Sequence, residues 1–321
     1  MEKGSLIERR LDNAVYNRIS RKNKAVTGPG IGNDFSRVGN IILTDGNSEK
    51  PEEAWIKAMN NYACACAVPE GVRITMLLPE SVKESQIKKW MDIFQRYADS
   101  CGVSIVGGHT QISDKAAAPF FAVQVFGTAS GCNADKKSVR PGMGIVMCGY
   151  AGMLGTDILI RRNCERIKDR FGNMLNSECI FGPEACSILP AAETIRRVFA
   201  GSQRTEVPYI HDISCGGVYA ALWQLGRWAD CGLLADNNKI PIRQETIEIC
   251  ECLDVNPYLI DGTGGLLMIC SEEDVVLREL ENAGIKAEVI GRITEGAERM
   301  VAFGDGELRK LEPSSVDEAY R

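Results

Sequence analysis

The stretch IHDISCGGVYAALWQLGRWA, residues 210–229, places a His-Asp pair and two glycines between a short apolar run and a helical pattern. Glycines at such a junction let backbone N–H groups approach an anion closely, and a helix N-terminus favours negative charge. One face of the predicted helix gathers apolar side chains, namely Val218, Ala221, Leu222, Leu225 and Trp228. The stretch therefore predicts a strand, a glycine turn that can meet an anion, and a buried helix.

The other of the two histidines lies in a similar setting, the segment VGGHT at residues 106–110. Here a predicted strand runs into two glycines and a polar side chain, which is the backbone geometry that a phosphate group requires. Both His109 and His211 can titrate near neutral pH and serve in proton transfer. A structural reading stays open for both, since a lone histidine is commonly a hydrogen-bonded structural group and Asp212 can simply cap the helix.

Length and composition indicate the number of domains and the broad class of the protein. A chain of 321 residues exceeds the size of most single cores and indicates two domains. Hydrophobic residues make up 45% and charged residues 25%, as in ordinary soluble globular proteins. No apolar run approaches the roughly 18 residues of a membrane span, and the first residues lack the apolar core of a signal peptide. We expect a cytoplasmic protein that does not associate with a membrane.

Charge narrows the range of ligands. The net charge of −6 argues against a general nucleic-acid binder, because such proteins carry an excess of positive charge. A small anionic ligand would need local help from Mg²⁺, from helix N-termini or from a few basic side chains.

The thirteen cysteines are an odd number scattered along the chain, which favours reduced thiols over a disulfide framework. The pairs Cys64/Cys66 and Cys250/Cys252 have C-x-C spacing, unlike the C-x₂₋₄-C spacing of structural zinc sites. We therefore expect most thiols to behave as small buried apolar groups. A thiol-based metal or redox protein is the weakest of the functional hypotheses.

Helical and strand patterns alternate in residues 1–140, which predicts a layered α/β domain. The expected helices are 6–19, 51–68 and 83–100, and the expected strands are 38–44, 72–78, 103–106 and 120–128. Residues 130–142 lack an apolar period and are the best boundary. A second domain, 141–321, is expected to hold strands at 145–149 and 266–270 and helices at 188–199, 218–229, 243–253 and 273–283.

Several polar groups follow predicted strands or glycine-rich turns. They are Asn33 and Asp34, Thr44 and Asp45, the helix pair Asn60 and Asn61, and Asp212. Each aspartate taken alone is most simply a turn former or a helix cap. Taken together, these hard oxygen ligands suit Mg²⁺, which shares carboxylates with substrate phosphates.

The order of these motifs resembles the ATP-binding superfamily of aminoimidazole ribonucleotide (AIR) synthetase, which includes selenophosphate synthetase, thiamine-monophosphate kinase and the hydrogenase-maturation carbamoyl dehydratase. The motifs are GIGND at 30–34, LTDG at 43–46, AMNNYA at 58–63, VGGHT at 106–110 and the pattern HDxxxGGVxxAL at 211–222. Residues 240–260 and 289–296 are most similar to the hydrogenase-maturation branch.

The resemblance implies a PurM-like two-domain fold. Its N-terminal α/β domain would pair its sheet with that of a second subunit, closing a β-barrel in a homodimer. Its C-terminal domain would be α+β. ATP would lie between the domains, with its phosphates held through Mg²⁺ by Asp34, Asp45, Asn61 and Asp212.

Further residues are implied by the same resemblance to surround the nucleotide. They are Gly30, Gly32, Thr44, His211 and a turn formed by Gly107, Gly108, His109 and Thr110, with His109 and Asp212 as the candidate catalytic residues. The implied chemistry is phosphate transfer from ATP to a small amide- or carboxylate-like substrate, which demands positioning and charge neutralisation.

The sequence departs from the family pattern in several places, of which Asn61 and the missing terminal cysteine favour an alternative. The hydrogenase-maturation branch usually has Asn-Asp where this chain has Asn60-Asn61, and it more often has Asp in place of His109. That branch also ends in a cysteine, whereas this sequence ends DEAYR, and the first cysteine is Cys64, so selenium chemistry is not expected. The alternative is a nucleotide-binding accessory or regulatory protein of hydrogenase maturation that acts through a partner protein without turnover.

Overall fold

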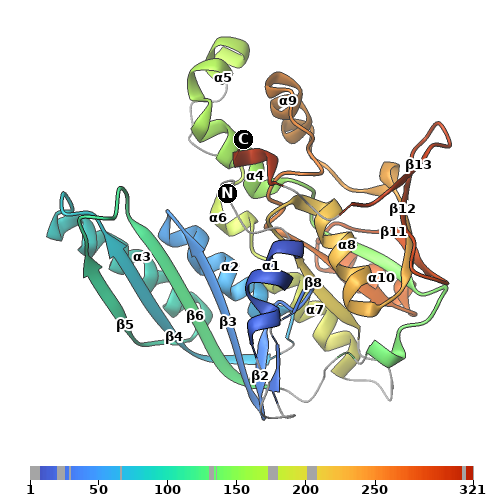
Figure 1. The fold of residues 1–321 in the computed structure, drawn as a ribbon, viewed down its shortest axis with the longest axis horizontal. Helices are drawn as coiled ribbons and strands as arrows, with labels where there is room; N and C mark the ends of the chain where they lie inside the picture. Colours follow the sequence, from blue (N-terminus) through green and yellow to red (C-terminus); the bar gives the residue numbers. More distant parts are fainter. Residues whose placement is uncertain are drawn as a thin grey trace. The chain divides into compact units, whose positions relative to one another are not determined.

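Two units make up the computed structural model, which describes residues 8–19, 26–28, 30–65, 67–129, 134, 136–172, 180–200, 208–312 and 316–320 (Figure 1). Among these, residues 26–28 and 34–129 form the N-terminal unit. The C-terminal unit contains residues 8–19, residues 30–33 and all described residues from 134 onward. Whereas the sequence placed residues 1–140 in one domain, the structure groups residues 8–19 and 30–33 with the C-terminal unit.

The N-terminal unit is built on a six-stranded sheet with the order β1-β2-β3-β6-β4-β5. The β4–β5 pair is parallel and the other pairs are antiparallel. The strands are β1 (Val26–Thr27), β2 (Ser36–Val38), β3 (Ile41–Ser48), β4 (Ala67–Leu78), β5 (Ser104–Ile112) and β6 (Phe120–Ala129).

Helices α2 (Pro51–Ala63) and α3 (Glu84–Cys101) cover one face of this sheet (Figure 1). Strand β3 alternates strictly, with Ile42, Thr44 and Gly46 buried and the intervening residues exposed. Aromatic rings fill the layer between helices and sheet, with the Phe94 ring centroid 6.4 Å from that of Trp55 and 5.9 Å from that of Phe121. The alternation along β3 therefore gives the sheet one face that packs against α2 and α3, and an opposite face, called the open face below, that these helices do not cover.

The C-terminal unit is built on a seven-stranded sheet with the order β13-β12-β9-β11-β7-β10-β8. Strands β9 and β12 are parallel and the other neighbours are antiparallel. The strands are β7 (Gly144–Cys148), β8 (Tyr209–Ile213), β9 (Gly232–Asp236), β10 (Gly265–Cys270), β11 (Ala287–Thr294), β12 (Arg299–Ala302) and β13 (Leu308–Lys310).

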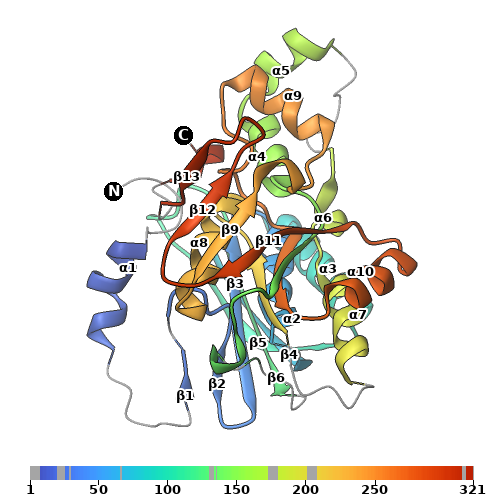
Figure 2. The same ribbon diagram turned by 90° about the vertical axis from the view of Figure 1, so that its right-hand side faces the viewer.

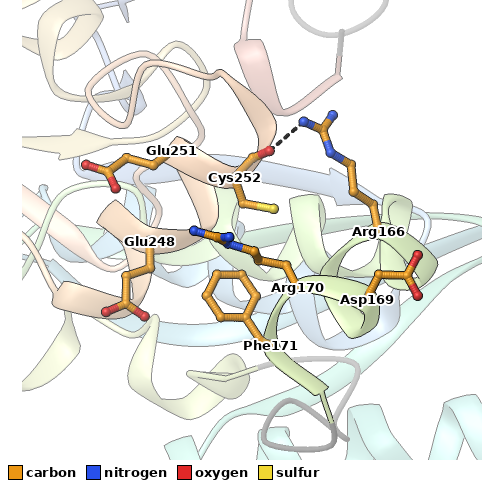
Figure 3. A pocket seen from close by; sticks show the side chains of 7 residues that line it. All are labelled: Arg166, Asp169, Arg170, Phe171, Glu248, Glu251 and Cys252. Atoms are coloured by element: carbon orange, nitrogen blue, oxygen red, sulfur yellow. Dashed lines mark hydrogen bonds between the residues drawn. The ribbon is translucent and has the colours of Figure 1, made fainter.

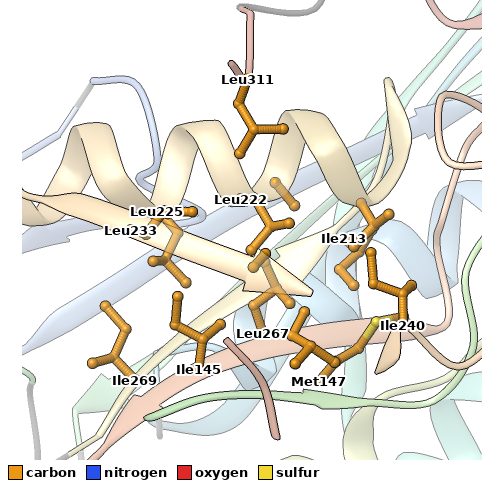
Figure 4. Close-up of a cluster of buried hydrophobic side chains, with 14 of the residues drawn as sticks. Ile145, Met147, Ile213, Leu222, Leu225, Leu233, Ile240, Leu267, Ile269 and Leu311 are labelled. Atoms are coloured by element: carbon orange, nitrogen blue, oxygen red, sulfur yellow. The ribbon is translucent and has the colours of Figure 1, made fainter. Parts of the chain in front are cut away.

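Helix α8 (Gly217–Ala229) packs its apolar stripe on this sheet and forms the main core of the unit (Figure 4). Leu222 and Leu225 lie over Ile145, Leu267 and neighbouring apolar side chains. Every residue of β7, β8 and β10 is buried, so these strands are covered on both faces. The predicted helix at 218–229 agrees with α8 to within one residue.

The C-terminal unit contains further helices besides α8. Helices α7 (Leu189–Ala200) and α10 (Glu273–Asn282) contact one another, as Figure 2 shows. The others are α1 (Glu8–Ala14), α4 (Met153–Arg162), α5 (Cys164–Phe171), α6 (Gly182–Ala185) and α9 (Gln244–Leu253). In the described part of the chain, no helix is both long and apolar enough to cross a bilayer.

Several predicted boundaries were wrong. The helix expected at 51–68 ends at Ala63, because strand β4 begins at Ala67 and pairs with β6. The strand expected at 38–44 is a hairpin of β2 and β3 that turns at Gly39, where φ is +62°. Of the boundary segment expected at 130–142, residues 130–133 and 135 lie outside the described residues.

The C-terminal segment is anchored by a buried carboxylate. Asp317, only 3% exposed, accepts the Gly216 N–H and the Ala319 N–H, each at 2.9 Å. Asp261, fully buried, lies close enough to act on it electrostatically. Burial and the nearby Asp261 raise the pKa of Asp317 from its ordinary 3.8 to about 6, although the two N–H donors oppose the rise.

We predict that Gly46→Ala destabilises the N-terminal unit by about 2–3 kcal/mol. A Cβ at this position would lie 2.3 Å from the Ala58 nitrogen and 2.6 Å from the Ala54 carbonyl oxygen, so α2 would have to move away from β3. Urea unfolding measures the change. The matched control is Gly39→Asn, which has open space and a left-handed backbone that Asn tolerates. Equal stability of the two variants would contradict this account of Gly46.

We predict that Asp317 makes the free energy of unfolding fall between about pH 4 and pH 6. Because its folded pKa is raised, the proton it binds stabilises the fold below its ordinary pKa, and that contribution is lost as the pH rises through about 6. Urea unfolding of the wild type and Asp317→Asn at several pH values isolates the effect, expected to be about 3 kcal/mol in total. A difference between the two proteins that does not change with pH would refute the prediction.

Candidate functional site

The middle of strand β3 presents a carboxylate, that of Asp45, on a fixed backbone. The Thr44 hydroxyl is buried and donates to the Ala58 carbonyl of α2 at 2.9 Å. The Asn61 amide donates to the Asp45 backbone oxygen at 2.9 Å. Both bonds join β3 to α2, while the Asp45 side chain is exposed on the open face of the sheet. The structure thus gives Thr44 and Asn61 positioning contacts and leaves the Asp45 carboxylate facing outward.

The glycine loop before β2 divides between the units. Gly30 and Gly32 belong to the C-terminal unit, whereas the half-buried Asp34 belongs to the N-terminal unit. A Cβ at Gly32 would lie 2.8 Å from the Gln224 carbonyl oxygen of α8, and the Tyr209 hydroxyl donates to the Gly32 carbonyl. Gly32 is therefore required for close packing on α8.

The segment Gly107–Thr110 is not a turn, which corrects the prediction. It lies inside β5, where parallel pairing with β4 carries the strand past both glycines to Ile112. Gly107 and Gly108 have φ values of +154° and +153°, and a Cβ at Gly108 would collide with the Ile74 carbonyl oxygen. The glycines therefore permit an unusual strand pairing, and His109 and Thr110 are exposed on this edge strand.

Strand register separates His109 from Asp45. Asp45 on β3 pairs with Gln124 on β6, and Gln124 pairs with Arg73 on β4. Arg73 in turn pairs with Gly107 on β5. Two strands, β6 and β4, thus lie between β3 and β5. At a spacing of about 4.8 Å between strands, the backbones at Asp45 and His109 are roughly 15 Å apart. Within this unit the two side chains cannot bind the same phosphate group.

The His-Asp pair of β8 is deeply buried. His211 and Asp212 are each 2% exposed. The His211 Nε2 lies 3.0 Å from the Gln224 Oε1, and its ring stacks on that of Tyr209 at a centroid distance of 6.0 Å. Of the two readings that the sequence allowed for His211, these contacts favour the structural one.

The glycine turn before α8 meets a negative charge supplied by the chain itself. Gly216 and Gly217 have left-handed backbones with φ of 85° and 70°. The Gly216 N–H donates to the Asp317 carboxylate at 2.9 Å, and the Gly217 N–H donates to the Ser214 carbonyl at 3.0 Å. An anion does lie at this turn, as the sequence predicted, but it is a carboxylate of the C-terminal segment.

Two buried carboxylates near the glycine turn were not predicted from the sequence. Besides Asp317, the fully buried Asp261 accepts the Thr263 N–H at 3.0 Å and the Thr263 hydroxyl at 2.6 Å. The segment DGTGG at 261–265 is rich in glycine and begins with an acid, like the two histidine segments, and that similarity was the available signal. Asp317 had no comparable signal, since the residues around it carry no motif.

The predicted metal ligands come from both units of the chain. Across the described residues, no group of three His, Cys, Asp or Glu side chains is arranged to hold a metal ion. Asp34, Asp45 and Asn61 lie in the N-terminal unit and Asp212 in the C-terminal unit. Their oxygen atoms fit the chemistry of Mg²⁺, which is typically bound by one or two carboxylates together with phosphates and water.

A wide hollow of about 990 Å³ lies between α5 and α9, and it carries both signs of charge (Figure 3). Arg166 and Arg170 lie opposite Glu248 and Glu251, and the Arg166 guanidinium donates to the Cys252 carbonyl at 2.6 Å. Opposed charges of this kind give the hollow no selectivity for an anion or a cation.

Comparison with known proteins identifies both halves of the chain. The description "AIR synthase related protein, N-terminal domain" matches residues 51–129, and "AIR synthase related protein, C-terminal domain" matches residues 187–302. Carbamoyl dehydratase HypE of Rhodobacter capsulatus is 25% identical over 266 residues, which cover 78% of this chain and 72% of that protein.

Solved structures share the fold over nearly the whole chain. The HypE chain of a HypE-HypF complex has a TM-score of 0.75 at 18% identity and covers 94% of this chain and 99% of its own. HypE in complex with ATP has a TM-score of 0.71 at 16% identity, covering 99% and 95% respectively. With both domain models matched in order along the sequence, this chain belongs to the AIR synthase related family.

Proposed function

We propose that this protein is an ATP- and Mg²⁺-dependent enzyme that phosphorylates, and thereby activates, an amide- or carboxylate-like oxygen of a small substrate. The observation that carries the proposal is the ordered match of both AIR synthase related domains, in a chain whose fold resembles that of HypE in complex with ATP. Carbamoyl dehydratase HypE, a relative at 25% identity, supports activation of an amide-like oxygen.

The proposal gives the exposed Asp45 carboxylate the leading role toward nucleotide phosphates. Its backbone is fixed by the Asn61 amide, so the carboxylate is held without a large entropic cost. Asp34, the Asn61 amide oxygen and Asp212 are the further proposed ligands. When bound, Mg²⁺ would neutralise phosphate charge. Thr44 and Gly32 are proposed to act by positioning, because their contacts are with α2 and α8 respectively.

His109 is proposed as the residue that moves a proton. It is exposed on β5, so a substrate can reach it without rearrangement of the core. Because the backbones at His109 and Asp45 of one chain are roughly 15 Å apart, this role requires that His109 contacts the substrate and not the phosphate bound at Asp45.

A second candidate is an accessory protein of hydrogenase maturation that binds nucleotide without turnover. It is favoured by the likeness to the HypE chain of a HypE-HypF complex, and by Asn61, a neutral ligand where the hydrogenase-maturation pattern has an acid. A neutral ligand weakens Mg²⁺ binding. This candidate predicts nucleotide binding with no ADP release and retention of a maturation partner protein.

We also propose that the open face of the N-terminal sheet binds a second copy of the chain. Large apolar side chains on this face are 39–52% exposed, which is unusual for a face left in water. They come from β2, β3, β4 and β6 and comprise Val38, Ile41, Leu43, Val68, Leu77 and Phe120. Pairing two such faces would close a barrel between subunits and would place Asp45, which lies on the same face, beside the partner subunit.

The nucleotide proposal is tested by Asp45→Asn, with Asp92→Asn on the exposed side of α3 as the matched control. Calorimetric titration with ATP, with and without Mg²⁺, is followed by ³¹P NMR for ADP release. We expect Mg²⁺-dependent binding that Asp45→Asn weakens about tenfold or more and Asp92→Asn leaves unchanged. Unchanged binding and turnover in Asp45→Asn would remove Asp45 from the metal site. Binding without ADP release, with candidate substrates present, would favour the accessory protein.

The homodimer proposal is tested by Leu43→Glu, which places a charge on the open face of β3. Analytical ultracentrifugation should show a dimer for the wild type and a monomer for this variant, since burying an unpaired carboxylate costs several kcal/mol. Leu308→Glu is the control, because Leu308 is 58% exposed on β13 of the other unit. A wild-type monomer, or a dimer that survives Leu43→Glu, would contradict the proposal.

A further inference from the structure

A pocket of about 400 Å³ lies within the C-terminal unit, and none of the predicted site residues lines it, although its lining residue Leu266 is the cross-strand partner of Asp212. It is lined by the end of β7, the start of α4, the segments before α6 and α7, the start of β10 and the residues before β11. Its volume is in the range of small-molecule sites. Side chains such as Met153, Ile188 and Leu266 make much of its wall apolar.

The charge lining this pocket is positive. Arg243, at the N-cap of α9, and Lys286, just before β11, both contribute to the lining. None of the described lining residues is an aspartate or a glutamate. Each cation has an exposed acidic neighbour, Glu245 at 3.6 Å from the Arg243 Nε and Glu288 at 3.3 Å from the Lys286 Nζ. Such exposed pairs are weak, so a bound anion can compete with them.

The Arg243 guanidinium is held by aromatic rings. Its central carbon lies 5.2 Å from the centroid of the Tyr150 ring and 5.8 Å from that of the Phe181 ring. Cation–π contacts of this kind orient the planar guanidinium and leave its edge for hydrogen bonds to an anion. The group is therefore ordered before a ligand arrives.

A buried carboxylate fixes the wall that carries Phe181. Asp157 of α4 is 1% exposed and accepts the backbone N–H groups of Ile180, Phe181 and Gly182 at 2.7, 3.3 and 3.1 Å. Three N–H donors on one carboxylate form a strong local anchor. Asp157 therefore acts as a positioning residue for the aromatic side of the pocket.

We infer that this pocket binds a small molecule with an anionic group, a carboxylate or a phosphate, on an apolar or aromatic body. The anionic group meets Arg243 and Lys286, and the body lies against the apolar wall. The inference stands on the pocket alone and does not depend on nucleotide binding, so the site should bind such a ligand in the absence of ATP and Mg²⁺.

The test is calorimetric titration of the whole chain, without nucleotide or metal, with phenyl phosphate, benzoate, inorganic phosphate and benzyl alcohol. We expect one site per chain, at which phenyl phosphate or benzoate binds at least about tenfold more tightly than inorganic phosphate or benzyl alcohol. The tighter of the two aromatic anions tells whether the pocket prefers a phosphate or a carboxylate.

Two variants locate the probe. Arg243→Gln should weaken its binding about tenfold or more, whereas Arg309→Gln should leave it unchanged. Arg309 is a matched control, since it lies 4.6 Å from the Phe303 ring centroid and pairs with Glu307, yet it does not line the pocket. Ala185 lines the pocket and is exposed. Ala185→Trp keeps both cations but fills part of the pocket, so it should also weaken binding of the probe.

Three results would overturn the inference. The first is binding of the aromatic anions no tighter than that of inorganic phosphate. The second is retention of binding in both Arg243→Gln and Ala185→Trp. The third is loss of binding in Asp45→Asn with retention in Arg243→Gln, which would place the probe at the proposed nucleotide ligands and leave the pocket empty.

Discussion

Packing of α8 against the seven-stranded sheet is the constraint on which the C-terminal unit depends. Val218, Leu222 and Leu225 are fully buried on that sheet, so neither the axis nor the start of the helix can shift without opening the core. The start of α8 is equally tight, because a Cβ at Gly217 would lie 2.4 Å from the Tyr258 carbonyl oxygen. The glycine turn is thereby fixed in place, and with it the positions of His211 and Asp212 at the end of β8.

A fixed turn at a helix N-terminus attracts negative charge, and in this protein the attraction is met internally. The Asp317 carboxylate accepts the Gly216 N–H, and Asp261 is buried beside it. Two neighbouring buried carboxylates are costly, and backbone donors at the turn offset part of that cost. A phosphate could use the Gly216 N–H only by displacing Asp317. The exposed Asp45, whose backbone is held by α2, is therefore the better starting point for binding a nucleotide.

Sequence patterns correctly predicted those helices and strands whose buried face can be recognised from residues close together in the sequence. The apolar period of α8 and the alternation in β6 follow directly from the residues that face the core. Strand β5 was predicted too short because its two glycines resemble a terminator, whereas pairing with β4 extends it to Ile112. The carboxylate at the glycine turn could not be predicted, since Asp317 lies 101 residues from Gly216 in the sequence. A contact between residues so far apart in the sequence produces no periodic pattern from which it could be predicted.

The two histidine segments show most clearly what the sequence cannot decide. Both lie on strands at the edge of a sheet, β5 and β8, and both combine glycines with a polar side chain. Strand β8 is covered along its whole length, so His211 is buried and bonded to Gln224, whereas most of β5 is exposed and His109 with it. The difference arises from the elements that pack on each strand, which lie far away in the chain. Since a proton carrier must meet its substrate, the exposure of the strand, rather than the motif, is the reason for proposing His109 in that role.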